Sequence, residues 1–240
     1  MEQTLFEYDF GLVNEPYCKE HYLQNLGNVT VQTLNEGQVY TVDPELGSVY
    51  LMVMDRVLSV RNEENEILCT LKSGCHAELT TPSTIYSQGN AYIIQTHYYR
   101  GLTRIGMQLE DKCSLRFIDG CMDTLLISPL IKGDPCLNFL YIPQNTTQTL
   151  HTHPSARLGL VLHEKGVCVV ESEAIDLVPN RFFIVQDNVL HRFLTTDSEL
   201  GIFVFHPDSD FGPSNAEHPM INKSFIGGTS VTELRKIKDI

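Results

Sequence analysis

The stretch QTLHTHPSARLGLVLHEKG (148–166) and the stretch VPNRFFIVQDNVLHRF (178–193) carry the strongest signal in the chain. Both combine short apolar runs with Gly, Pro, Asn and Asp, which is typical of β-strands joined by tight turns. Alternate side chains of a strand share a face, so His151 and His153 point to the same side. Two imidazoles on one face can close on a single metal ion.

Similar short runs extend over most of the chain. A period of two, broken by turn residues, dominates from residue 28 to about residue 206, as in QVYTV, SVYLMVM, AYIIQTHYY and GIFVFH. Strands this short and closely spaced predict an all-β sandwich or barrel. Helical periodicity is clear only in SVTELRKIKDI (230–240) and weak around residues 15–26, so we expect a short C-terminal helix.

A faint internal repeat relates the two halves. EILCTLKSGCHAELTTPSTIYS in the first half and AIDLVPNRFFIVQDNVLHRF in the second share a layout of strand, turn, strand and a further strand. Aligning Gly74 with Asn180 places Ile85 opposite His191. The repeat predicts a duplicated barrel, and the alternative is two β meanders that share only a general layout.

The histidine pattern resembles the cupin superfamily. The first cupin motif runs Gly, H-x-H, Glu and Gly, and the second contains Gly, Pro, Gly, His and Asn in that order. In this chain the H-x-H pair falls on His151 and His153, and the histidine of the second motif falls on His191. The resemblance covers residues 137–206, whereas the first half matches only as a degenerate copy. It implies a double-stranded β-helix, or jelly-roll, barrel that holds one divalent transition metal, with Fe favoured and Ni, Zn, Cu or Mn as alternatives.

The resemblance leads to a tandem architecture. We expect an all-β bicupin, with a degenerate cupin-like domain over 1–120 and a cupin barrel over 121–240 that carries the metal site and the C-terminal tail. The boundary is expected within 112–136. A single cupin with an elaborate N-terminal β extension is the alternative. Cupins commonly pair through sheet edges, which protects exposed strands, so a homodimer is expected.

Several motif glycines are replaced. Asn145, Asn180 and Asn188 stand at three of these positions, and Asn tolerates a positive φ better than other residues with a side chain. Glu164 takes the remaining Gly position, with Gly166 just beyond it to close the hairpin. We therefore expect the turns to survive.

Arg157 stands where cupins usually place a Glu ligand. A guanidinium stays protonated and has no lone pair to offer, so Arg157 cannot bind a cation. One interpretation is a three-histidine metal site, with Arg157 at its rim binding a substrate carboxylate. The other is a site that has lost its metal and binds an anion through Arg and His. A satisfied core triad of histidines is a third, purely structural interpretation.

Other residues are weaker candidates for this pocket. Tyr141 and Gln148 have the parity expected of inward-facing residues, and His206 ends the strand GIFVFH. In the following segment, HPDSDFGP, Asp208 and Asp210 are interpreted either as an ordinary turn or as residues that order a loop at the barrel mouth.

Four more histidines are expected to lie outside the metal site or to contribute only from its edge. His163 is expected in a solvated turn, and His218 is considered as a cover from the C-terminal tail. In the first half, His76 and His97 stand alone and Ile85 takes the place of His191, so no metal is expected there.

The composition limits the partners. A formal net charge of −13 without a basic cluster argues against a nucleic-acid partner. The first residues, MEQTLFEYDF, do not form a signal peptide, and no stretch approaches the length of a membrane helix. Seven cysteines without a C-x-x-C pair indicate reduced thiols and a cytoplasmic location.

Two functional classes follow. The first is a metal-dependent enzyme acting on a small anionic molecule that carries a carboxylate, in the simplest case a non-haem iron dioxygenase, with Arg157 as a catalytic and substrate-binding residue. Cupins also include isomerases, lyases and decarboxylases, so the reaction type rests on the resemblance alone. The second class is a ligand-binding or regulatory cupin without turnover.

Overall fold

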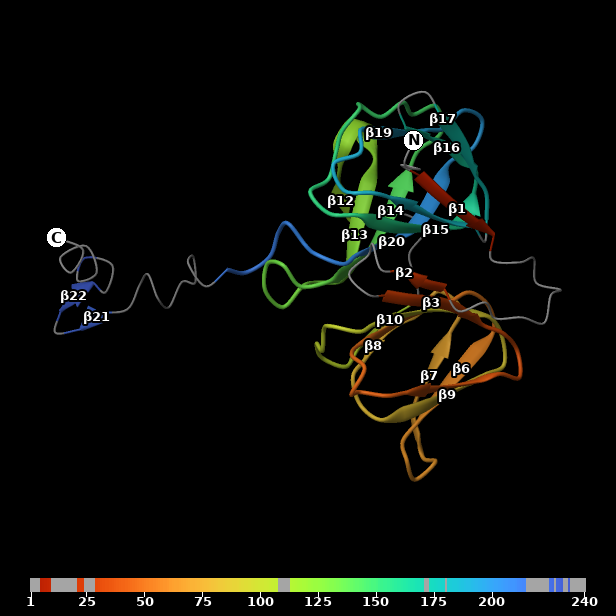
Figure 1. Cartoon of the computed structure of the whole chain (residues 1–240), viewed down its shortest axis with the longest axis vertical. Coiled ribbons are helices and arrows are strands. Elements are labelled where there is room, and N and C mark those ends of the chain that lie inside the picture. Colours follow the sequence, from red (N-terminus) through yellow and green to blue (C-terminus); the bar gives the residue numbers. More distant parts are fainter. Residues whose placement is uncertain are drawn as a thin grey trace.

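The protein is described by a computed structural model, which covers residues 5–9, 21–23, 29–107, 113–170, 173–179, 181–214, 225–226, 228–230 and 233. Nearly all regular structure in this part is antiparallel β-sheet, arranged as two barrels that lie one against the other (Figure 1). The expectation of an all-β fold is therefore confirmed. In the described part of the chain, no helix is long and apolar enough to cross a membrane.

The first barrel is built from two antiparallel sheets. In order across the sheet, the larger one contains β11 (Arg104–Gly106), β8 (His76–Leu79), β5 (Val49–Val53), β10 (Ala91–Thr96), β3 (Val29–Leu34) and β2 (His21–Leu23). The smaller one contains β4 (Val39–Val42), β9 (Ser83–Ser87), β6 (Val57–Arg61) and β7 (Ile67–Lys72). Its interior is a cluster of buried aliphatic side chains that includes Leu51, Leu58, Leu79, Ile85 and Ile93.

The second barrel has the same plan. Its larger sheet contains β1 (Leu5–Asp9), β18 (Arg181–Val185), β15 (Arg157–Glu164), β20 (Leu200–His206), β14 (Cys136–Ile142), β13 (Met122–Ile127) and β12 (Leu115–Arg116). Its smaller sheet contains β17 (Glu173–Leu177), β16 (Gly166–Val170) and β19 (His191–Leu194). Outside these sheets lie the 3-10 turn η2 (Ile118–Gly120) and the short pair β21 (Phe225–Ile226) and β22 (Thr229–Ser230).

The strand orders show the internal repeat. The order β8-β5-β10-β3 of the first barrel recurs as β18-β15-β20-β14, and β7-β6-β9 recurs as β17-β16-β19. The registers agree as well, because Val49 pairs with Leu79 on β8 while Arg157 pairs with Val185 on β18. Val49 is therefore the structural counterpart of Arg157.

The two barrels share an apolar interface. Sheet faces carrying Val31 and Ile94 from the first barrel and Leu158 and Phe203 from the second contribute to one buried cluster. At this interface, the Tyr50 ring of β5 meets the Phe205 ring of β20 edge to face, with centroids 5.2 Å apart. Face-to-face packing of two sheets leaves each barrel with its own separate interior.

Strands on both sides of the expected boundary belong to the second barrel. β1 pairs with β18, and β12 pairs with β13, although both β1 and β12 lie within residues 1–120. The division into 1–120 and 121–240 stays a prediction. The N-terminal strand β1 lies in the first half of the sequence but pairs in the second barrel.

The weak helical pattern around residues 15–26 is wrong where the structure describes it. Residues 21–23 form β2, because His21 to Leu23 pair with the edge of β3 and tertiary pairing outweighs a weak local pattern. The expected C-terminal helix lies outside the described residues except at Ser230, which is in β22, and Glu233.

Candidate metal centre

Three histidine side chains converge at one end of the second barrel. His151 and His153 lie in the connection between β14 and β15, and His191 begins β19. His151 and His191 form an isolated antiparallel bridge, with backbone N–H to O distances of 3.0 Å in both directions. Their ring centroids are 4.5 Å apart, and each lies 5.1 Å from the ring of His153. One ligand atom from each residue lies within 4.8 Å of the others.

The turns beside the site adopt the expected backbone. Asn145 and Asn188 both have φ of 58°, so the prediction that Asn keeps these turns is confirmed at both positions. Glu164 has φ of 59° at the hairpin between β15 and β16. Asn180 lies outside the described residues.

Backbone carbonyls orient two of the rings. The Nδ1 atom of His151 lies 2.8 Å from the carbonyl oxygen of Thr149, and the Nδ1 atom of His191 lies 2.9 Å from that of Val189. A carbonyl oxygen can only accept, so Nδ1 carries the hydrogen in both rings. The lone pairs of the two Nε2 atoms are then free for a metal, which is the usual outer-shell arrangement of a metal-binding histidine.

Burial keeps His153 and His191 neutral at pH 7. It lowers the pKa of His153 to about 3, with smaller contributions from Arg157 and the two other rings of the cluster. Burial likewise lowers the pKa of His191 to about 4, opposed by the hydrogen bond to Val189. A neutral imidazole is the form that binds a metal, so these two donors can bind one at neutral pH without first losing a proton.

The three donors fit a transition-metal ion. Imidazole nitrogens bind such ions at about 2.0–2.2 Å, which places the nitrogens roughly 3–4 Å from one another. The present separations need only small side-chain movements to reach that range. In the described part of the chain, this is the one group of three or more His, Cys, Asp or Glu residues with its ligand atoms this close.

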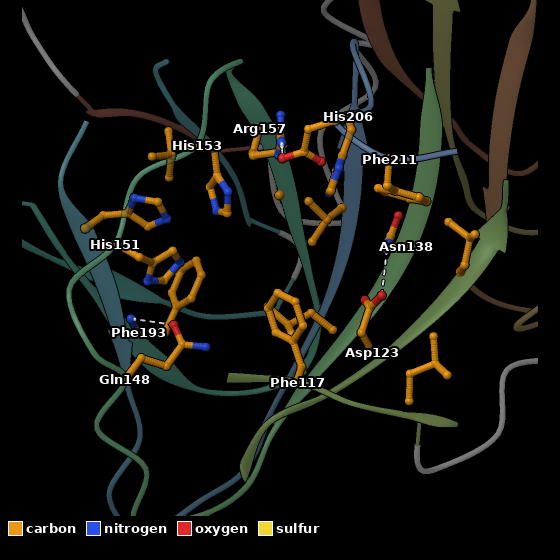
Figure 2. Close-up of a pocket in the computed structure, with 18 of the residues that line it drawn as sticks. Phe117, Asp123, Asn138, Gln148, His151, His153, Arg157, Phe193, His206 and Phe211 are labelled. Carbon is orange, nitrogen blue, oxygen red and sulfur yellow. Dashed lines mark hydrogen bonds and ion pairs between the residues drawn. The ribbon is translucent and has the colours of Figure 1, made fainter. Parts of the chain in front are cut away.

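The histidines line a cavity of about 370 Å³ inside the barrel (Figure 2). Most of its wall is apolar, formed by Leu115, Phe117, Leu125, Leu140, Phe183, Val185, Phe193, Val204 and Phe211. The polar groups besides the histidine trio are Arg116, Asp123, Asn138, Gln148, Arg157, His206 and Asp210. An apolar cavity with a few convergent polar groups is the usual form of a small-molecule site.

Arg157 is buried in the cavity wall. The residue is 5% exposed, because β15 begins here and carries the side chain inward, where it lines the same cavity as the three histidines. Its Nη1 donates to the carbonyl oxygens of Ser155 and Ala156 and to the Ser155 hydroxyl. Its Nη2 lies 3.8 Å from the Asp210 carboxylate, and its Nε has no partner. Burial lowers the pKa of Arg157 and Asp210 opposes this, but a guanidinium stays charged at neutral pH.

Solved structures with the same arrangement of strands are cupins. No family model matches the sequence, and no curated protein matches it significantly. The cupin 2 conserved barrel domain protein from Leptotrichia buccalis has a TM-score of 0.56 at 13% identity, covering 85% of this chain and 89% of that one. This chain has the cupin fold. A variant of oxalate decarboxylase from Bacillus subtilis has a TM-score of 0.59 at 10% identity, covering 98% and 84%.

A third cupin of known structure binds an aromatic acid. Salicylate 1,2-dioxygenase from Pseudoaminobacter salicylatoxidans, solved as a variant in complex with gentisate, has a TM-score of 0.56 at 8% identity. The match covers 75% of this chain and 68% of that one. At these identities the three likenesses concern the fold.

Two further candidates predicted from the sequence line the cavity. Gln148 is 1% exposed, and its side chain accepts from the backbone N–H of Phe193 and donates to the Cys121 sulfur. His206 projects beside Arg157, with its Nδ1 buried and without a partner (Figure 2). Burial lowers the pKa of His206 well below its usual value, and Arg157 and His153 add to the shift. His206 is therefore a neutral group on the wall of the cavity.

Tyr141 does not face the cavity. It packs with Phe139 and Cys113 on the other face of β14, and its hydroxyl donates to Glu199. The alternate residues Asn138 and Leu140 line the cavity instead, so the expected parity of this strand was off by one residue.

The remaining histidines take no part in the described site. His163 is in β15 with its ring against Gly201, so the expected solvated turn is wrong. His76 lies in β8, and His97 is hydrogen-bonded to Thr30 at 2.7 Å, both in the first half of the chain. His218 lies outside the described residues.

Four polar residues of the cavity, namely Arg116, Asp123, Asn138 and Asp210, were not selected from the sequence as pocket residues. Asp210, named only as a loop residue, reaches Arg157, and Asp123 and Asn138 form a hydrogen-bonded pair. Asn138 interrupts the apolar run LNFLYIP, and that interruption was a usable signal for an inward-facing polar residue.

Proposed function

We propose that this cupin is a metal-dependent enzyme of the dioxygenase type that acts on a small carboxylate-containing molecule. The observation that carries the proposal is that the three histidines and Arg157 line the same cavity. A group of neutral imidazoles able to hold a cation and a fixed guanidinium able to hold an anion then face one small volume.

The histidine trio supports a divalent transition metal, with Fe favoured and Ni, Zn, Cu or Mn as alternatives. When bound, such an ion would supply Lewis-acid or one-electron chemistry at the end of the cavity where the three histidine rings converge. The carbonyls of Thr149 and Val189 fix two of the rings, so the chain itself sets the direction of the donors.

Arg157 supports an acidic substrate. Its Nη1 is held by three oxygens of its own loop, which fixes the plane of the guanidinium. Its Nε and Nη2 have no hydrogen-bond partner within the described residues, since Asp210 is 3.8 Å from Nη2. This edge of a guanidinium matches the two oxygens of a carboxylate.

The rest of the cavity supports a substrate with an apolar body. Aromatic and aliphatic side chains form most of the wall, and they would exclude water around the bound molecule. Two of the structural neighbours are named for enzymes of carboxylic acids, oxalate decarboxylase and salicylate 1,2-dioxygenase. These names agree with the proposed substrate class but leave the reaction type open among the dioxygenase, decarboxylase, isomerase and lyase chemistries of cupins.

Binding of a small anion without turnover is the second candidate function. It is favoured by Arg157, which adds a positive charge where a carboxylate ligand would otherwise stabilise a cation. The two candidates share the pocket and differ in whether the histidine trio carries a working metal.

Oxygen consumption by the iron-loaded protein separates the two candidates. The protein is loaded with Fe(II) anaerobically and transferred to air-saturated buffer, and uptake of O2 is then measured after the addition of small keto, hydroxy and aromatic acids. We expect uptake with at least one acid, its loss in His153→Ala and its retention in His97→Ala, a control in the first half of the chain. Acids that bind without O2 uptake or product formation contradict the enzymatic proposal and favour the second candidate.

A further inference from the structure

The cavity has a second polar group at a distance from the histidines. Asp123 on β13 and Asn138 on β14 both line it, and Asn138 Nδ2 donates to Asp123 Oδ2 at 2.7 Å. Figure 2 shows this pair on the opposite side of the cavity from His151 and Gln148. The residues paired with the two on neighbouring strands, Leu115, Leu125 and Leu140, are apolar, and Arg116 follows Leu115 on β12 and also lines the cavity.

The Asp123 carboxylate forms no ion pair with a described residue. Burial raises its pKa, and only the hydrogen bonds from Asn138 and from the backbone of Thr124 oppose that shift. A carboxylate taken out of water is stabilised by a cation or by further hydrogen-bond donors, and the protein supplies only part of what is needed.

The side-chain oxygen of Asn138 is a hydrogen-bond acceptor that no donor of the described residues reaches. The residue is 7% exposed, and its Nδ2 is already engaged by Asp123. Its Oδ1 is buried and has no hydrogen-bond partner, which is costly for a polar atom inside a protein. A hydrogen-bond donor on a molecule in the cavity would satisfy this oxygen.

We propose that Asp123 and Asn138 form a second binding subsite, which receives a hydrogen-bond-donating group at the end of the substrate remote from its carboxylate. This inference rests on the proposed function, because it takes Arg157 as the group that binds the carboxylate. The substrate class is then an amino acid or hydroxy acid in which an apolar segment separates the two polar ends. An ammonium group matches the subsite best, because it brings both donors and the missing positive charge.

Matched acids test the subsite directly. The probes are straight-chain acids of roughly four to eight carbons that end in an ammonium, a hydroxyl or a methyl group, which covers the range of spans that a cavity of this size allows. Their affinities for the purified protein are measured by calorimetry, and metal content is determined on the same sample. At the best chain length, we expect the donor-ended acids to bind at least about tenfold more tightly than the methyl-ended acid.

Two variants of the pair and one control test whether Asp123 and Asn138 cause the preference for donor-ended acids. Asp123→Asn should reduce the preference to less than about threefold and leave the affinity for the methyl-ended acid within about twofold, because it removes a charge without changing shape. Glu64→Gln removes an exposed carboxylate of the first barrel and should behave as the parent. The exchange Asp123→Asn/Asn138→Asp keeps one carboxylate and one amide, and it should restore the preference even if the single variant is poorly folded.

Equal affinities for the three endings, or no binding of any donor-ended acid, overturn the subsite. Arg157→Ala separates this failure from failure of the proposed function. If the parent loses all acid binding on that substitution but shows no preference for a donor, the subsite alone is wrong. If Arg157→Ala binds the acids as the parent does while the donor preference persists, the subsite stands and the carboxylate-binding role of Arg157 is wrong.

Discussion

The two barrels share one topology and differ in what fills them. Val49 is the counterpart of Arg157, and two residues further along the same strands Leu51 corresponds to Gly159. In the first barrel, Leu51 and Ile85 are 1% and 0% exposed and belong to a continuous aliphatic core. In the second barrel, the corresponding region is a cavity of about 370 Å³ with histidines on its wall.

The difference separates residues needed for the fold from residues needed for function. Protein interiors are normally close-packed, and an unfilled apolar cavity lowers stability. The first barrel shows that this strand arrangement can be filled with Leu, Ile and Val. The second barrel has a cavity lined by polar groups where the first has close-packed aliphatic side chains. Such a departure from close packing is expected at a functional site.

Gly159 shows how the cavity is shaped. A Cβ atom at this position would lie 2.3 Å from the Phe183 ring, which packs directly over the glycine. The counterpart of Phe183 in the strand register is Ala77, so the first barrel pairs a large residue with a small one in the reverse order. The larger side chain of the pair therefore lies on β18 in the second barrel and on β5 in the first. In the second barrel, the ring of Phe183 forms part of the cavity wall.

The largest effect is expected from placing the first-barrel residue into the second barrel. His191→Ile makes the site resemble its counterpart around Ile85 and removes a donor that is 1% exposed. We expect metal content to fall below about a tenth of an equivalent, because two imidazoles hold an ion far less tightly than three. Elemental analysis checks this, with circular dichroism to show that the fold persists. A folded His191→Ile protein that keeps its metal would remove His191 from the ligand set.

Arg157 is expected to give the next largest effect. Arg157→Ala should weaken binding of an acidic ligand by about 2–5 kcal/mol, roughly thirty- to several-thousandfold, while the metal stays bound. Arg157→Glu should also lose the acid but hold metal at least as tightly, because a carboxylate adds an oxygen ligand and a compensating charge. Calorimetry with any acid that binds, combined with metal analysis, measures both effects. Unchanged acid affinity in Arg157→Ala would mean that the guanidinium serves packing alone.

A smaller effect is expected in the pH dependence of stability. The pKa of His191 is about 4 in the folded protein, below the usual value of about 6.5 that applies when the chain is unfolded. Below pH 6.5, His191 is therefore protonated in the unfolded state but not in the folded state. The free energy of unfolding consequently decreases as the pH falls toward 4.

Denaturant unfolding of the metal-free protein between pH 7 and pH 5 measures this slope. His191 contributes up to about 1.4 kcal/mol per pH unit, and His191→Gln should make the profile flatter by that amount. The comparison is made with chelator present, because bound metal would compete with the protons. An identical slope in the parent and the variant would show that His191 does not titrate in this way.

The smallest effect on the site is expected in the first half of the chain. His76→Ala and His97→Ala should leave metal content unchanged, because neither belongs to the cluster of donors. His76 is 5% exposed, so its substitution should lower thermal stability while metal remains bound. Loss of metal from either folded variant would extend the site beyond the second barrel.

Local sequence signals predicted the frame of the site. His151 and His153 share one site, but they lie in the connection between β14 and β15, so the expected strand at these residues is wrong. Asn at positions 145 and 188 was a sufficient signal because the positive φ of a turn depends on neighbouring residues. The polar contacts inside the cavity could not be predicted from such local signals. Whether Asp123 meets Asn138, or Asp210 meets Arg157, depends on the pairing of strands and loops that are distant in sequence. The parity of Tyr141 was wrong for the same reason, since an apolar strand with both faces covered gives no periodicity to follow.

The metal content of the purified protein tests the central claim most directly. Three histidines whose ligand atoms lie within 4.8 Å of one another predict about one equivalent of a divalent transition metal per chain. They also predict that adding Fe, Ni or Zn to the metal-free protein raises Tm by about 5–10 °C at a hundredfold excess over Kd. Elemental analysis and a thermal melt on the same sample give both values. Less than about a tenth of an equivalent, together with no rise in Tm for any of the three metals, would contradict a metal centre in this barrel.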